Sequence, residues 1–91
     1  MILACRNTLP GPTLVFMSLF DGTYDADVDA AYIRLAPRIE PGEATRQEIV
    51  SLPAGEVILD FNSDGHLLGI EVLGARSMVT PAALASLRRI D

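Results

Sequence analysis

The sequence of 91 residues contains no lysine and no tryptophan, and it has one cysteine and one histidine. Without lysine, seven arginines stand against twelve acidic residues, and the formal charge is −5. Direct binding of nucleic acid or of an anionic membrane needs a basic surface, so this charge balance argues against both. One cysteine excludes an internal disulfide, and one histidine excludes a multi-histidine metal site. The missing lysine also excludes a P-loop, and we expect no cofactor.

Long hydrophobic runs are missing as well. A transmembrane helix needs about 20 apolar residues, and no such run occurs. Residues 1–20 lack the basic start and the cleavage site of a secretory signal, so we expect a cytoplasmic protein. Residues 1–16 contain a proline-glycine breaker cluster, and we expect them to form an N-terminal extension or arm, with Met17 as an alternative start to Met1. Residues 17–91 are then predicted to form a single small β-rich domain.

Hydrophobic periodicity predicts an α+β fold, with a small antiparallel sheet of about four to five strands and one C-terminal helix. We expect strands at 13–20, 30–35 and 45–52, and a hairpin over 57–73. Period-two alternation is clear at 30–35, where Ala31 and Ile33 alternate with Tyr32 and Arg34. The dipeptide Asp21-Gly22 looks like a hairpin signal, but the more telling turn is expected just after it, at Asp25–Asp29.

The hairpin over 57–73 is the clearest element. Its turn carries Asn62, Asp64 and Gly65, residue types that tolerate or favour left-handed backbone. Gly69 lies in the middle of the returning strand, where a missing side chain indicates a bulge or another element packed closely over it.

The helix is predicted over residues 81–90, because Thr80 can cap it and Pro81 suits its first position. About ten residues do not hold a helix alone in water, so its apolar stripe must dock on the sheet or on a partner. Arg88 and Arg89 are expected near the negative end of the helix dipole. The stripe is formed by residues at helical spacing: Ala83, Leu84, Leu87 and Ile90.

Three closely spaced acids, Asp25, Asp27 and Asp29, resemble the opening of a calcium-binding loop. The full pattern needs glycine and glutamate where Ala30 and Ala36 stand, so only a weak divalent site remains open. The alternative is a solvated turn whose carboxylates bind nearby backbone N–H groups.

A second hypothesis concerns catalysis. Carboxylates can carry out acid/base chemistry when their surroundings separate their pKa values, which requires that they converge in one pocket. The alternative is that these acids form turns or lie on a solvated face. Cys5 and His66 could form a thiol-nucleophile pair only if the fold brings them together. The acids concerned are Asp25, Asp29, Asp60 and Glu71.

Two segments carry a family resemblance. Residues 24–35, YDADVDAAYIRL, are similar to the pattern Y-D-x-x-x-D-x-x-Y-I-x-L, and residues 57–73, VILDFNSDGHLLGIEVL, to V-I-L-D-y-x-x-D-G-x-L-x-G-I-E-x-L. Together they resemble the bacterial family catalogued as domain of unknown function 2283. The resemblance implies a small antiparallel sheet and no established activity. It also implies an antitoxin-like or partner-binding role, since members often stand beside small toxin-like proteins. The motif residues are Tyr24, Asp25, Asp29, Tyr32, Asp60, Asp64, Gly65, Gly69 and Glu71.

Hydrophobic residues make up 49% of the chain. A domain of this size buries only about 60–65% of the surface of its unfolded chain. Either both faces of the sheet are covered or apolar surface remains for a partner, and we favour a homodimer that serves as a non-enzymatic interaction or regulatory module. The alternatives are an antitoxin-like partner of a small basic toxin and a weak metal- or ligand-binding enzyme that uses the four acids above.

Overall fold

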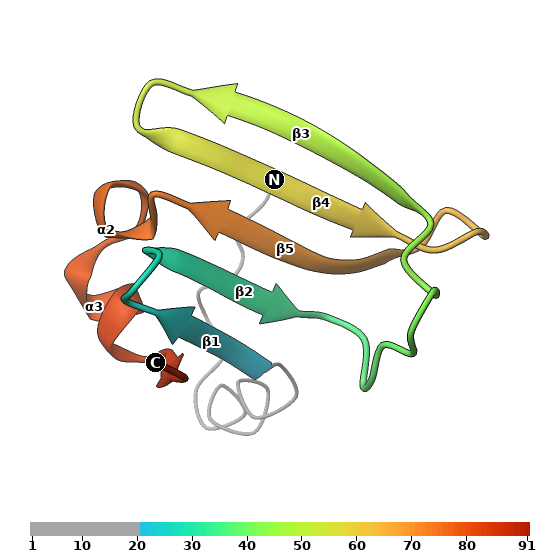
Figure 1. The fold of residues 1–91 in the computed structure, drawn as a ribbon, viewed down its shortest axis with the longest axis horizontal. Helices are drawn as coiled ribbons and strands as arrows, with labels where there is room; N and C mark the ends of the chain where they lie inside the picture. Colours follow the sequence, from blue (N-terminus) through green and yellow to red (C-terminus); the bar gives the residue numbers. More distant parts are fainter. Residues whose placement is uncertain (1–20) are drawn as a thin grey trace, which may run out of the picture.

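The computed structural model describes residues 21–91, which form one six-stranded sheet in the order β3-β4-β5-β2-β1-β6 (Figure 1). Neighbouring strands are antiparallel, except that β6 runs parallel to β1. Two short helices, α2 and α3, lie between β5 and β6 in the chain. The elements are β1 (Asp21–Asp25), β2 (Ala30–Arg34), β3 (Arg46–Leu52), β4 (Gly55–Phe61), β5 (Leu67–Leu73), α2 (Ala75–Met78), α3 (Pro81–Ala85) and β6 (Arg88–Arg89).

The predicted α+β class and the hairpin over 57–73 are confirmed, as β4 and β5. The predicted turn chemistry is also present: the Asn62 side-chain oxygen accepts hydrogen bonds from the Asp64 N–H at 3.0 Å and the His66 N–H at 2.9 Å. Gly65 has a φ of 86°, which favours glycine. The strand predicted at 13–20 and the arm at 1–16 lie outside the described residues.

The expected strand number and purely antiparallel pairing are wrong, because Asp21–Asp25 form the unpredicted strand β1 and residues predicted as the end of the helix form β6. α3 ends at Ala85, and the Leu87 N–H closes a short turn to the Leu84 carbonyl at 3.2 Å. Arg88 and Arg89 then pair with β1, and the Ile90 N–H donates to the Tyr24 carbonyl at 3.0 Å. The edge of β1 thus gains backbone partners that a continued helix would not supply. Consequently the two arginines do not lie at a helix end.

The turn expected at Asp25–Asp29 is present between β1 and β2, whereas Asp21 and Gly22, which also carry a turn signal, lie in β1. A Cβ atom at Gly22 would come within 2.6 Å of Leu87 Cδ2, so the glycine makes room for Leu87 on the sheet. The prediction that the apolar stripe after Thr80 docks on the sheet holds for Leu84 and Leu87, whereas Ile90 is 55% exposed.

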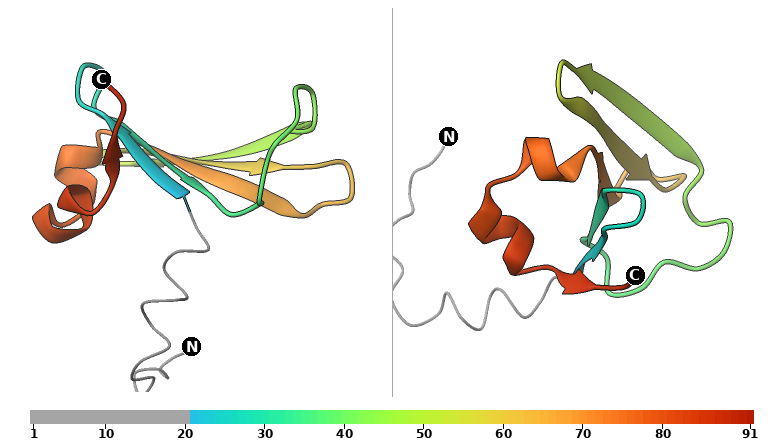
Figure 2. Two further views of the ribbon diagram at one scale, coloured as in Figure 1. Left: turned by 90° about the horizontal axis from the view of Figure 1, so that it is seen from below. Right: turned by 60° about the vertical axis from the view of Figure 1, so that its left-hand side comes forward.

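The core lies on one face of the sheet, which we call the helix face because α2 and α3 cover it (Figure 2). Directly opposed residues of antiparallel strands point to the same face. On this face α2 and α3 pack mainly against β1, β2 and β5, and α2 also reaches the start of β4 at Gly55, whereas β3 lies beyond them (Figures 1 and 2). The row that crosses five strands consists of Tyr24, Ala31, Val72, Val57 and Val50.

The core is thin. In residues 21–91 the only buried side chains belong to five residues, and the largest of them is the 4% exposed ring of Tyr24. The stability of the fold therefore depends strongly on individual polar contacts and helix caps. The five residues with buried side chains are Tyr24, Ala31, Leu68, Val72 and Ala75.

Among residues 21–91, neither helix has the length and the apolar composition that spanning a membrane requires.

We predict that Thr80→Ala lowers the free energy of unfolding by about 0.5–1 kcal/mol, because the Thr80 side chain caps α3. Its Oγ1 accepts a hydrogen bond from the Ala83 N–H at 3.2 Å. Thr80→Ser keeps the hydroxyl and should retain most of the stability. Urea denaturation of both variants tests this, and equal losses in the two would contradict it.

Candidate functional site

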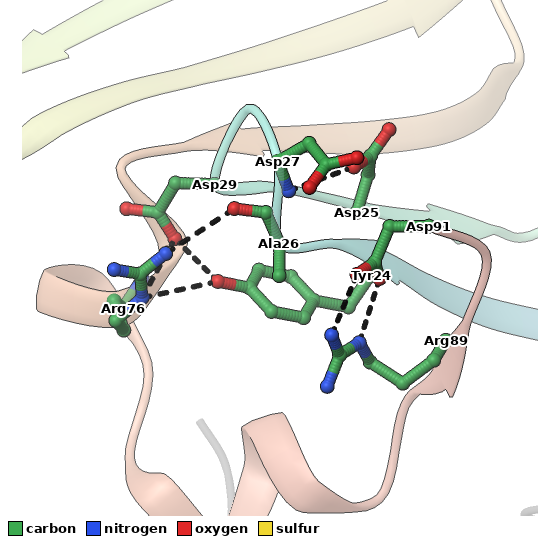
Figure 3. Close-up of polar contacts among 8 residues, drawn as sticks. All are labelled: Tyr24, Asp25, Ala26, Asp27, Asp29, Arg76, Arg89 and Asp91. Carbon is green, nitrogen blue, oxygen red and sulfur yellow. Dashed lines mark hydrogen bonds and ion pairs between the residues drawn. The ribbon is translucent and has the colours of Figure 1, made fainter.

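The loop between β1 and β2 is held by Asp29, whose backbone is left-handed with a φ of 54° (Figure 3). The Tyr24 hydroxyl donates to Asp29 Oδ1 at 2.8 Å, and the Arg76 backbone N–H donates to the same atom at 2.9 Å. The Asp29 carbonyl accepts from the N–H groups of Gly74 at 3.0 Å and Ala75 at 3.1 Å. One aspartate thus ties the β1–β2 turn to the first residues of α2.

The hydrogen bonds from Tyr24 and the Arg76 backbone, together with the charge of the nearby Arg76 guanidinium, hold the pKa of the Asp29 carboxyl below its usual value. Arg76 Nε lies 3.8 Å from Asp29 Oδ1 and 3.3 Å from the Tyr24 hydroxyl. A carboxylate stabilised in this way is a weak base, since its charged form already has its partners. Asp29 is therefore poorly suited to proton abstraction.

The other two acids of this loop turn elsewhere. Asp25 Oδ1 accepts a hydrogen bond from the Asp27 N–H at 2.9 Å, and the Asp27 side chain is exposed (Figure 3). Asp29 meanwhile points to Tyr24 and Arg76. Within residues 21–91 no group of three histidine, cysteine, aspartate or glutamate side chains is placed to hold a metal ion.

A second polar cluster lies on the face opposite the helices, which we call the polar face. The Tyr32 hydroxyl donates to Asp60 Oδ2 at 3.1 Å, and Gln47 Nε2 donates to Asp60 Oδ1 at 2.8 Å. Tyr32 of β2 thus reaches over β5 to β4. Burial and the charge of Asp60 raise the pKa of Tyr32 to about 12, so its phenol stays protonated and donates.

Gly69 provides the path for this contact. A Cβ atom at Gly69 would overlap the Tyr32 hydroxyl and lie 2.5 Å from Tyr32 Cζ. The register of β4 and β5 also shifts between Asp60 and Phe61. Both features that the sequence predicted for Gly69, a bulge and close packing, are therefore present.

The four acids proposed for catalysis do not converge. Asp25 and Asp29 lie at the β1–β2 turn, whereas Asp60 and Glu71 lie on the polar face of β4 and β5. A largely apolar pocket of about 290 Å³ lies beside α3, and none of these acids lines it. Its one charged group, Arg89, is paired with Asp91, with Nη2 and Oδ2 2.6 Å apart (Figure 3). The pocket is lined by Tyr24, Pro81, Leu84, Ala85, Leu87 and Arg89.

The remaining sequence candidates have simpler positions. Asp64 and Gly65 lie in the exposed β4–β5 turn, beside an exposed His66. Cys5, the suggested partner of His66, lies outside the described residues. The structure therefore offers no catalytic arrangement among these residues of the described chain.

The most conspicuous surface feature is the edge strand β3. All seven of its residues are exposed, and in residues 21–91 only β4 pairs with it. Three of them are large and apolar: Ile49 is 58% exposed, Val50 45% and Leu52 46%. β3 contains no proline and no bulge, two devices that protect an edge, and its two charged residues, Arg46 and Glu48, pair with each other. The opposite edge of the sheet, β6, has only two residues.

The residues of β3 are predicted as a strand over 45–52, but no local pattern indicates that this strand lies at the edge of the sheet. The order of strands in a sheet is decided by contacts between distant segments. The alternating composition of β3 would suit a central strand with one solvated face equally well, so it does not identify the edge. Only the high apolar content of the chain indicates that some apolar surface stays exposed.

Residues 23–76 match the family described as protein of unknown function DUF2283, and the chain belongs to this family. The match ends at Arg76, so it includes β1 to β5 and the start of α2. No curated protein and no solved structure matches the chain.

Gly69→Ala is predicted to destabilise the protein by about 1–3 kcal/mol, the usual cost of overpacking. Tyr32→Ala removes the ring that the new methyl group would meet. In that background Gly69→Ala should cost much less, so a double-mutant cycle measured by urea denaturation should show a clear coupling energy. Additive losses would show that Tyr32 is not the obstacle.

The lowered pKa of Asp29 makes stability depend on pH. Its folded-state pKa lies below the unfolded value of 3.8, so its contribution is present above about pH 4 and is lost as the pH falls. Asp29→Asn should therefore be less stable than the wild type at pH 7 and lose less stability between pH 7 and pH 3. Asp27→Asn removes the same charge from an exposed position in the same loop and should behave like the wild type. Urea denaturation at both pH values tests this, and equal pH dependence in Asp29→Asn and the wild type would refute it.

Proposed function

We propose that this protein is a non-enzymatic interaction module that assembles as a homodimer. The observation that carries the proposal is the exposed strand β3, which presents backbone groups and three large apolar side chains at the edge of the sheet. Ile49 points to the polar face and Val50 and Leu52 to the helix face, so contact along this edge would remove apolar surface on both faces from water.

The arrangement of the acids supports a non-enzymatic role. Asp29 and Asp60 each accept two side-chain or backbone hydrogen bonds that join separate parts of the fold. Asp25 accepts one within its own turn. These carboxylates serve as acceptors for internal donors, which accounts for their presence without a substrate.

An antitoxin-like role is a second candidate, and it is also a non-enzymatic interaction with a partner protein. The formal charge of −5 would complement a small basic protein. This alternative predicts that a small basic protein encoded beside the gene co-purifies with the chain after co-expression. Such a result would add a second partner to the proposed homodimer.

The homodimer is tested by sedimentation velocity of the full chain at tens of micromolar, under reducing conditions. We expect a species of twice the chain mass of 9.8 kDa. A monomer at these concentrations would contradict the proposal. Calorimetric titration with calcium and magnesium tests the enzyme alternative, and we expect no binding tighter than millimolar.

A further inference from the structure

We propose that the homodimer forms by antiparallel pairing of β3 with β3 of a second copy, which joins the two six-stranded sheets into one. This inference rests on the proposed function and names the surface that carries it. β3 is seven residues long, pairs with β4 without a register shift, and is exposed from Arg46 to Leu52. The outer backbone groups of such a strand are a template for another strand.

The sequence of β3 fits itself in one particular register. Pairing about a twofold axis at Ile49 places this residue opposite its own copy and overlaps the whole strand. The other pairs are Arg46 with Leu52, Gln47 with Ser51, and Glu48 with Val50. If the twofold axis lay at Glu48 instead of Ile49, the two Glu48 carboxylates would lie directly opposite each other, which is unfavourable.

Charge is compatible with this register. Each Glu48 carboxylate is already in an ion pair with Arg46 of its own strand. Across the twofold axis Glu48 faces Val50 rather than a second acid. The interface therefore contains no directly opposed like charges.

In this register the two copies also present the same face of their sheets on the same side. Opposed residues of antiparallel strands point to the same face, so the twofold axis is perpendicular to the sheet. The helix faces of both copies then lie on one side, and the row from Tyr24 to Val50 of each copy ends against Glu48 of the other copy. Ile49 of each copy lies on the polar face, next to Ile58.

Register-specific cross-linking tests the geometry in a Cys5→Ser background. At Ile49 the Cα atoms of the two copies would lie about 4.5–5.5 Å apart, within the range of a disulfide. Ile49→Cys should therefore form a covalent dimer under mild oxidation. Val50→Cys is a matched control on the same strand, because its two copies are diagonal neighbours about 7–8 Å apart and should cross-link poorly.

A second variant tests the energetics. Ile49→Lys places two ammonium groups opposite each other and removes two apolar side chains from the interface. We expect the dimer dissociation constant to rise about tenfold to a hundredfold. Val28→Lys changes an apolar residue that is 67% exposed in the β1–β2 turn, and it should leave the constant unchanged. Circular dichroism checks that both variants are folded.

The outcomes separate the two proposals. Selective cross-linking at Ile49 together with a monomeric Ile49→Lys variant supports the β3 pairing. Equal cross-linking at both positions, or an Ile49→Lys variant as dimeric as the wild type, overturns the β3 pairing and leaves the homodimer itself in place. A monomeric wild type overturns both.

Discussion

The constraint on which this structure depends is the cover of a single sheet. Six strands present two faces and two edges, whereas the described helices have four and five residues and cover one end of one face. A sheet face is stable in water when a second layer buries it. In residues 21–91 only five side chains are buried, all seven residues of β4 are only partly buried, and all seven of β3 are exposed. The fold therefore has a small core and a large apolar surface for its size.

With so small a core, specific polar contacts fix the arrangement of the strands. Asp29 joins the β1–β2 turn to α2, and Tyr32 joins β2 to β4 across Gly69. These residues stand in the two motifs that define the family resemblance. Their spacing suggests a ligand site when it is read along the chain, because acids and tyrosines recur at short intervals. In the fold the same residues face different partners, and their hydrogen-bonding capacity is used internally.

The sequence predicted the parts of this fold that short-range chemistry decides. The β4–β5 hairpin follows from alternation and from Asn62 and Gly65 in its turn, and the start of α3 follows from Thr80. α2 begins after the left-handed Gly74, and it is too short to carry a pattern. β6 exists only because its two residues pair with β1, which lies more than sixty positions earlier in the chain. The contact between Asp29 and Arg76 joins residues 47 positions apart, so neither could be derived from local patterns.

The same constraint distinguishes the ways in which two copies can associate. Stacking through the polar face would bury Asp60, Glu71 and Arg34, and buried charges are costly without matched partners. Stacking through the helix face would have to accommodate α2 and α3, which stand above one end of the sheet (Figure 2). Pairing at β3 avoids both obstacles, because it adds backbone hydrogen bonds and apolar contacts and does not cover Asp60 and Arg34 on the polar face. The edge is thus the surface where association removes apolar area from water without desolvating an unpaired charge.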